Sequence, residues 1–271
     1  MNILYWILFG VIQGVFEWIP VSSEAILFIM SVYFGRTLEE AFAYAILMHL
    51  PTGLASLTVY GKEYVKTFKA LKNIEFYNIP RFIILATIAT GITAIPTLVI
   101  YDIFLKYAEE TLRNTTAVIS ILIGITMIIT ALIMKKAYKS GLKTLNNIKD
   151  KHSISVGIFQ GLSIIPGISR SGITIACLSY IGFDANSSIN GSFMLAAPVS
   201  IAAFISILLF NPIESQTIGK CIPIAISMTI TYLVSISTMK ILIKTAKKLK
   251  HWMLLLIIGM LLTISGIIYV I

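Results

Sequence analysis

The sequence has 271 residues, of which 57% are hydrophobic and only 12% are charged. A soluble domain carries roughly 25% charged residues, so this chain has too few of them to cover a water-exposed surface. The composition predicts an integral membrane protein and excludes a water-soluble fold.

Four apolar runs approach or reach the roughly 20 residues that a helix needs to cross the hydrocarbon of a bilayer. They cover residues 82–101, 117–134, 222–243 and 252–271. We therefore expect an all-α polytopic membrane protein.

Two polar side chains lie within an apolar stretch near the N-terminus. Gln13 and Glu17 are four residues apart, a spacing that places both side chains on one face of a helix. Pro20 then interrupts the segment, and three polar residues follow it: Ser22, Ser23 and Glu24. A carboxylate within a membrane segment is costly without a partner and by default marks a function. The alternative, a glutamate that reaches from a helix end to the interface, leaves Gln13 and the serine pair unexplained.

His49 precedes Pro51 in a second apolar helix. Nothing near it in the sequence has the spacing of a metal site or a catalytic motif. We expect this histidine to make a packing or polar contact rather than to take part in catalysis.

Basic residues gather in three segments, 62–81, 135–151 and 244–250. Such clusters beside membrane spans are typical of cytoplasmic loops. The net charge of +9 therefore needs no nucleic-acid partner, and none is predicted. Segments 102–113 and 211–216 are predicted to be external loops, and both termini are predicted to be external.

An internal repeat occurs at an offset of 147 residues. Residues 10–14 (GVIQG) match residues 157–161 (GIFQG), and residues 49–51 match residues 196–198. We expect a single transmembrane domain over 1–271, made of two inverted repeats at about 1–145 and about 152–271. Each repeat would hold about three spans and a broken, re-entrant helix pair, and inverted repeats of this kind form their sites where they meet.

The broken segment of the second repeat carries the strongest signal. After Pro166 and Gly167 come three hydroxyl residues around an arginine, in the order Ser169, Arg170, Ser171 and Thr174. Hydroxyls, backbone N–H groups at a new helix N-terminus and a guanidinium together form a cradle for phosphate oxygens. An arginine that only marks topology would not need these neighbours.

At these residues the sequence resembles the undecaprenyl-diphosphate phosphatase family, the bacitracin-resistance type of membrane phosphatase. Residues 13–17 (QGVFE) resemble its Glu/Gln-x-x-x-Glu motif, and residues 20–23 (PVSS) its Pro-Val-Ser-Ser run. Residues 166–174 (PGISRSGIT) fit its second motif at every defined position. The resemblance covers essentially the whole chain.

The resemblance implies a cell-membrane enzyme that removes the terminal phosphate of a polyprenyl diphosphate lipid at the outer side of the membrane. It implies a divalent cation, usually Mg²⁺, bound by Glu17 with support from Gln13. Ser23 would be the nucleophile, and Glu17, Arg170, Gln13 and Glu24 would assist catalysis. The diphosphate would be held by a group of small residues around Arg170, namely Ser22, Gly167, Ser169, Ser171 and Thr174.

Three positions depart from the common bacterial pattern of the family. Gln13 replaces a glutamate, Glu24 replaces a small residue, and Ile26 stands where the family has a histidine that is a candidate acid or base. Our hypothesis is that Glu24 or Glu17 takes over as base, which leaves serine and water open as the attacking group. The lipid also stays open between an undecaprenyl and a dolichyl-type chain.

A transporter or flippase for a polyprenyl phosphate or another anion is the alternative function. Inverted repeats with broken helices also serve alternating access, and an anion cradle suits a carrier as well as an enzyme. Phosphate release in detergent distinguishes the two, because a carrier releases none.

Overall fold

Helices make up the secondary structure of the described residues, which are 3–35, 38–74, 78–111, 115–137, 141–210, 221–245 and 251–270 of a computed structural model. Over these ranges the only strand-like pairing is an isolated bridge between Lys143 and Phe183. Four segments are long and apolar enough to cross a membrane: Asn78–Ile100, Ala117–Ala137, Ala185–Leu209 and Cys221–Thr245. These findings confirm an all-α, multi-pass membrane protein.

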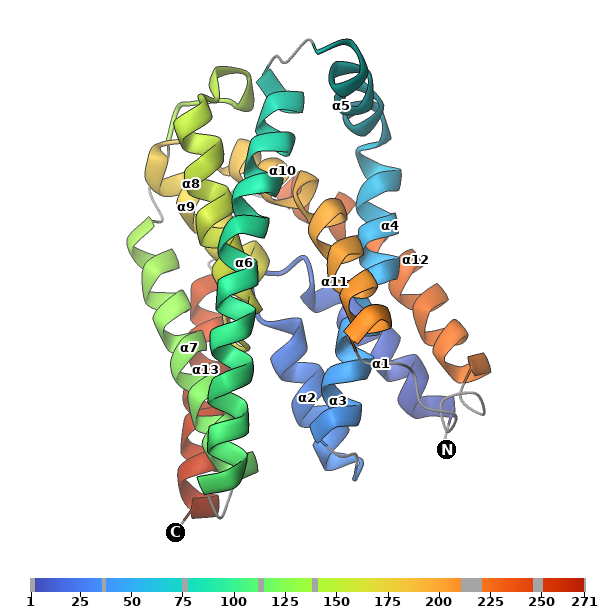
Figure 1. The fold of residues 1–271 in the computed structure, drawn as a ribbon, viewed down its shortest axis with the longest axis vertical. Helices are drawn as coiled ribbons and strands as arrows, with labels where there is room; N and C mark the ends of the chain where they lie inside the picture. The colour runs from blue at the N-terminus through green and yellow to red at the C-terminus, as the bar shows by residue number, and fades with distance from the viewer. Residues whose placement is uncertain are drawn as a thin grey trace.

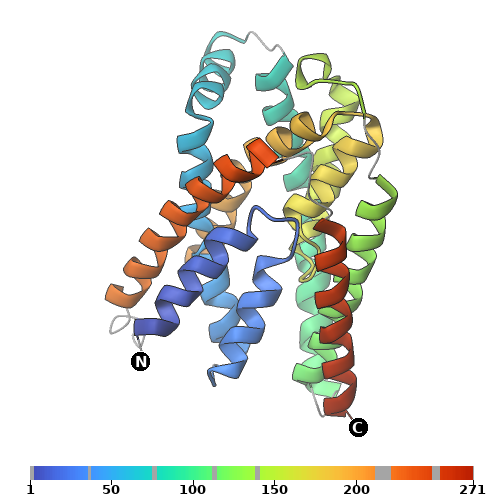
Figure 2. The ribbon, with the colours of Figure 1, turned by 180° about the vertical axis from the view of Figure 1, so that it is seen from behind.

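Two helical hairpins enter the molecule from opposite ends (Figures 1 and 2). The first consists of α1 (Ile3–Phe16) and α2 (Ser23–Tyr33), and the second of α8 (Asp150–Gly161), the short 3-10 helix η2 (Leu162–Ile164) and α9 (Arg170–Ile181). Their turns meet, since Ser171 Oγ donates to the carbonyl oxygen of Ile19 across 3.3 Å. The predicted broken helix pairs are therefore present in both halves.

Two further helices are interrupted rather than reversed. α3 (Leu38–Leu47) continues into α4 (His49–Val59) through Met48, and α10 (Ala185–Met194) continues into α11 (Ala196–Phe210) through Leu195. The first residues of α4 and α11, His49 and Ala196, are 147 residues apart, as are those of α2 and α9, Ser23 and Arg170. Helix boundaries thus recur at the offset seen in the sequence. The inverted relation and the division into two repeats stay predictions, because membrane orientation decides them.

The long helices frame the hairpins. They are α6 (Asn78–Thr111), α7 (Thr115–Ala137), α12 (Cys221–Thr245) and α13 (His251–Val270), and the shorter α5 (Gly61–Asn73) and η1 (Leu145–Asn147) complete the chain. α7 packs against α13, α8 against α6, and α1 against α12. The first arm of each hairpin, α1 or α8, therefore packs against one long helix, α12 or α6, from the other part of the chain.

Close helix packing at glycines accounts for the match between residues 10–14 and 157–161. A Cβ at Gly14 on α1 would lie 2.7 Å from Val234 Cβ on α12, and one at Gly161 on α8 would lie 1.9 Å from Thr93 Oγ1 on α6. Small residues at this spacing let two helix backbones approach closely in a membrane protein. The repeated pattern therefore has a packing cause in both halves.

Both chain ends lie at one end of the molecule, and α5 and the start of α8 lie at the other (Figure 1). The lysine-rich segments 62–72 and 149–151 belong to that second end, and its cytoplasmic side stays a prediction. One loop was predicted wrongly: α6 continues to Thr111, so most of segment 102–113 is helical. Its Ala, Glu and Lys residues are good helix formers, which accounts for the difference. The predicted external loop 211–216 lies outside the described residues.

Candidate active site

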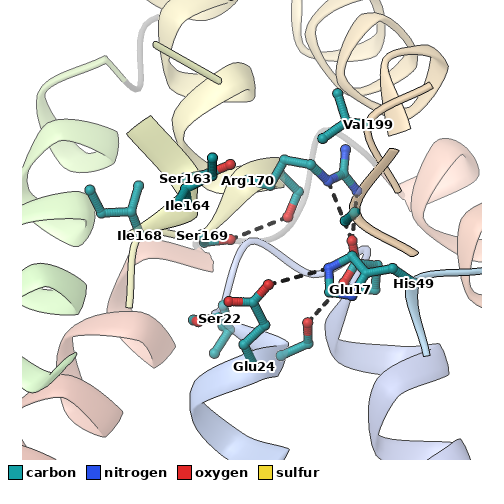
Figure 3. A pocket seen from close by; sticks show the side chains of 14 residues that line it. Glu17, Ser22, Glu24, His49, Ser163, Ile164, Ile168, Ser169, Arg170 and Val199 are labelled. Atoms are coloured by element: carbon teal, nitrogen blue, oxygen red, sulfur yellow. Dashed lines mark hydrogen bonds and ion pairs between the residues drawn. The ribbon is translucent and has the colours of Figure 1, made fainter. Parts of the chain in front are cut away.

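A pocket of about 90 Å³ lies between the two hairpin turns and helices α4 and α11 (Figure 3). Seven residues predicted for the site line it: Glu17, Ser22, Ser23, Glu24, Ser169, Arg170 and Ser171. The remainder of the lining consists of Val21, His49, Ser163, Ile164, Ile168, Val199 and Ala203. Residues far apart in the sequence therefore form one polar pocket with an apolar rim.

Glu17 is the most heavily bonded group of the pocket. Its Oε1 accepts from Arg170 Nη2 at 3.0 Å and from Arg170 Nε at 3.3 Å. Its Oε2 accepts from Ser23 Oγ at 2.8 Å and from Gln13 Nε2 at 3.1 Å. Both side chains of the ion pair are nearly buried, at 5% and 9% exposure. Four donors on one carboxylate are what a buried charge needs to be stable.

Arg170 is the first residue of α9 and joins three elements. Besides Glu17, its Nη1 donates to the carbonyl oxygen of Ser192 at 3.3 Å, near the end of α10. Its guanidinium carbon lies 5.8 Å from the ring centroid of Trp18. The last carbonyls of a helix have no partner within it, so the break after α10 supplies an acceptor that orients the guanidinium.

Serines cap the two helices that begin at the pocket. Ser169 Oγ accepts from Gly172 N at 3.1 Å at the start of α9, and Ser22 Oγ accepts from Ala25 N at 3.3 Å at the start of α2. Helix N-termini carry free N–H groups and partial positive charge. Two of them open onto one pocket, which favours an anion as the bound group.

Three predicted site residues do not line the pocket. Gln13 lies behind Glu17 and supports it through the hydrogen bond given above. Thr174 is buried and bonds to Ser192 Oγ at 2.6 Å, so it fixes α9 against α10. Gly167 faces α7: its φ is +93°, and a Cβ there would lie 2.0 Å from Thr126 Oγ1. The glycine is required by backbone conformation and packing, whereas the sequence suggested an approach to the ligand.

Two lining residues were missed by the sequence analysis, His49 and Ser163. His49 makes the polar contacts that were expected of it, to Glu24 and to the carbonyl oxygen of Ala45, but it does so inside the pocket. Ser163 lies on η2 and donates to the carbonyl oxygen of Gln160 at 2.7 Å. The match of residues 49–51 with 196–198, each with a proline in third place, is the signal from which a helix break at His49 could have been predicted.

A metal held by Glu17 and Gln13 does not fit this arrangement. Both carboxylate oxygens of Glu17 are already taken, and its nearest charge is the guanidinium of Arg170. Gln13 Oε1 is a buried oxygen without a hydrogen-bond partner, and one amide oxygen is far short of the octahedral oxygen set that Mg²⁺ prefers. Across the described ranges no group of three or more His, Cys, Asp or Glu side chains could hold a metal ion.

Comparison with known proteins identifies the family of the chain. The family model described as bacitracin resistance protein BacA matches residues 6–264. The chain belongs to this family. A protein of Pyrobaculum islandicum is 31% identical over 98% of this chain and 97% of its own length, and one of Saccharolobus solfataricus is 29% identical over 98% and 96%. A third, from Haloarcula marismortui, is 28% identical over 98% and 97%. Each of the three is named undecaprenyl-diphosphatase.

Proposed function

We propose that this BacA-family chain hydrolyses undecaprenyl diphosphate, releasing its terminal phosphate and leaving the lipid monophosphate. The observation that carries the proposal is the pocket in which Arg170, two helix N-termini and a serine–carboxylate pair converge. The names of the relatives supply the substrate class. An isoprenoid diphosphate presents the anion that this pocket would bind and a tail that a membrane protein can accommodate.

Arg170 binds the diphosphate in this proposal. Guanidinium groups can pair with phosphate oxygens through two parallel N–H···O bonds. In the structure the two donors that would do so, Nε and Nη2 of Arg170, both bond to Oε1 of Glu17. The incoming phosphate competes with Glu17 for the same donors. Charge on the transferring phosphoryl group would then be stabilised by Arg170 and by the N–H groups at the start of α2 and α9.

Ser23 and Glu17 have the geometry of a nucleophile and its base, because Ser23 Oγ already donates to Glu17 Oε2 at 2.8 Å. In the first step Ser23 Oγ bonds to the terminal phosphorus and its proton passes to Glu17. The bond to the bridging oxygen breaks and the lipid monophosphate leaves. In the second step water attacks the phosphoserine, and Ser23 Oγ regains its proton from Glu17. A carboxylate that has lost its guanidinium to the substrate is the stronger base at the moment it is needed.

The location of the reaction is part of the proposal. The lysine-rich end of the molecule would be cytoplasmic and both termini external, in the cell membrane, as the charge pattern predicts. The magnesium requirement also stays a prediction, and no step above is assigned to a metal. Undecaprenyl and dolichyl-type diphosphates are both suitable substrates for its test.

The test is phosphate release from a C55 polyprenyl diphosphate by the purified full-length protein in detergent, with and without Mg²⁺. We expect turnover in the native protein and a loss of about 100-fold or more in Arg170→Ala, the scale for removing one transition-state donor. Arg81→Ala is the matched control, because Arg81 also pairs with a carboxylate, that of Asp150. Both side chains of this pair are about half exposed, and neither lines the pocket. This control should keep its activity.

The same assay excludes a carrier. Detergent leaves no second compartment, so a transporter or flippase would bind the lipid and release no phosphate. A folded native protein that releases none from either the C55 or a dolichyl-type diphosphate would refute the proposed function. Equal activity of Arg170→Ala and Arg81→Ala would refute the role of Arg170.

A further inference from the structure

One charged pair of the pocket has no part in the steps above. His49, the first residue of α4, places Nε2 3.3 Å from Oε1 of Glu24 on α2 (Figure 3). Both side chains line the pocket that holds Ser23 and Arg170. The histidine side chain is 10% exposed and the glutamate side chain is 28% exposed, so the pair faces the pocket from one wall.

The hydrogen-bond partners of His49 determine where its protons are. Nδ1 lies 3.1 Å from the carbonyl oxygen of Ala45, which can only accept, so Nδ1 carries a proton. Nε2 then faces a carboxylate oxygen. A bare nitrogen lone pair and a carboxylate would repel each other, so a second proton lies between Nε2 and Oε1. The pair therefore holds one transferable proton inside the pocket.

Position 26 offers no such proton. Ile26 lies one helical turn beyond Ser22 and Ser23 on α2, is absent from the pocket lining, and packs with the apolar cluster that includes Ile123, Met127 and Leu255 of α7 and α13. The hydroxyl groups of the lining are weak acids. Glu17 is occupied with Arg170, Gln13 and Ser23. His49 is thus the group in the pocket that has both a proton to give and a tautomer fixed by the backbone.

We propose that His49 is a catalytic residue that exchanges its Nε2 proton with the phosphate groups, and that Glu24 is the positioning residue that holds it. The inference deepens the proposed function and rests on it. It assigns the hydrolysis a second acid–base group, contributed by the α3–α4 break rather than by either hairpin turn.

With this exchange, the protons of both steps of the reaction are accounted for. As the bond between the terminal phosphorus and the bridging oxygen breaks, its electron pair stays on that oxygen, which takes the Nε2 proton of His49. Ser23 Oγ forms the new bond to phosphorus and gives its proton to Glu17. When water later attacks the phosphoserine, His49 Nε2 takes the proton that the water loses, and Ser23 regains its own from Glu17. One water is consumed, and every group returns to its starting state.

The charged groups around His49 determine how its activity depends on pH. Glu24 from α2, Glu17 at the end of α1 and Arg170 at the start of α9 surround the same pocket. The residues that face it from α11, Val199 and Ala203, are uncharged, and Ser227 and Thr231 of α12 contact Met48 beside it. Two carboxylates against one guanidinium favour the protonated imidazole.

The experiment measures kcat, KM and the pH profile of phosphate release for the full-length protein and for His49→Gln, His49→Ala and Glu24→Gln. We expect kcat to fall by about 100-fold or more in both histidine variants, the scale of general acid–base catalysis, with KM within a few-fold. The alkaline limb of the native profile should disappear in His49→Gln. In Glu24→Gln it should move to lower pH, because the imidazolium has lost its counter-charge.

His152→Gln is the matched control, since His152 caps the start of α8 and lies outside the pocket. It should keep the native kcat and pH profile. Native kcat in His49→Gln, or a loss of activity in which the pH limb is unchanged, would overturn the inference while the proposed function stands. A histidine variant with native thermal stability in detergent and a 100-fold lower kcat would support it. Absence of phosphate release from the native protein would instead count against the proposed function.

Discussion

The α1–α2 and α8–α9 hairpins share one construction and carry opposite charges. Each has a first helix packed through two glycines, a turn at the pocket, and a second helix capped by a serine, Ser22 or Ser169. At the next position Ser23 in the first hairpin corresponds to Arg170 in the second. Both hairpins therefore contribute hydroxyls to the pocket, and the first adds carboxylates whereas the second adds the cation. The comparison teaches that the scaffold is repeated, whereas a few residues at the turns determine the chemistry.

The largest expected effect comes from removing the charge that joins the two hairpins. Glu17→Ala leaves the guanidinium of Arg170 buried without a carboxylate, which costs about 3–5 kcal/mol for a buried pair. Denaturant unfolding in detergent measures the cost. Asp150→Ala, which breaks the half-exposed pair with Arg81, should cost about 1 kcal/mol or less. Equal losses in the two variants would show that the pair between the hairpins is not what holds them.

The glycines of the two first helices test whether the hairpins are packed alike. An alanine Cβ at Gly157 would lie 2.3 Å from the carbonyl oxygen of Ala86, and one at Gly14 would lie 2.7 Å from Val234 Cβ. Each substitution should cost about 1–3 kcal/mol, with the larger loss at Gly157, because overpacking forces backbone shifts. Gly91→Ala on α6 is the control, since a Cβ there meets nothing within 4 Å. Thermal unfolding in detergent ranks the three, and a loss at Gly91 as large as at Gly157 would contradict the expectation.

The two glutamines at matching positions should respond differently to a carboxylate. Gln13 donates to Glu17, whereas Gln160 Nε2 donates to the hydroxyl of Thr90 at 2.9 Å. Gln13→Glu replaces a donor by a like charge, so we expect about 10-fold slower phosphate release, partly restored by Mg²⁺ because a cation can bridge two carboxylates. Gln160→Glu should show no such restoration. A magnesium response of equal size in both variants would remove the distinction.

The smallest expected effect concerns the two serine caps. Ser22→Ala and Ser169→Ala each remove an acceptor for a helix N-terminal N–H and should each cost about 1 kcal/mol of unfolding free energy. Ser206→Ala is the control, because its hydroxyl bonds only within the interior of α11. If neither cap variant is less stable than this control, the caps do not define the starts of α2 and α9.

Much of the fold and the charged part of the site could be predicted from the sequence. The apolar runs 82–101, 117–134 and 222–243 correspond to three of the spans, whereas the span Ala185–Leu209 was not predicted. Pro20 and Pro166 mark the hairpin turns because proline interrupts helical hydrogen bonding. Glu17 and Arg170 stand out because ionisable residues are rare in such segments. The sequence predicted that Glu17 and Arg170 belong to one site, but not that they contact each other. The structure shows a direct ion pair of 3.0 Å between them.

The remainder depended on three-dimensional packing. His49 enters the pocket because α4 starts again after the break at Met48. Pro51, which has no N–H to bond to the carbonyl of Leu47, is the local mark of this break, but the sequence does not show that the helix start faces the pocket. Gly167 and Thr174 stand in the same motif as Arg170 but point to α7 and α10, since neighbouring positions around a helix start face different elements. Sequence shows which residue types are present, and the facing elements decide which of them reach the pocket.

The mismatch between Ser23 and Arg170 also bears on why the two halves form one polypeptide. Two identical copies assembled as a pair would carry the same residue at each matching position, so serine could not stand in one turn where arginine stands in the other. Fusing the halves frees each turn to diverge while their shared scaffold is kept. Glu17 and Arg170 occupy different places in the repeat, because the residue 147 positions after Glu17 is Ile164 and the residue 147 positions before Arg170 is Ser23. A pocket with the carboxylate on one turn only and the guanidinium on the other is thus open to a single chain that holds both turns, and closed to a pair of identical copies.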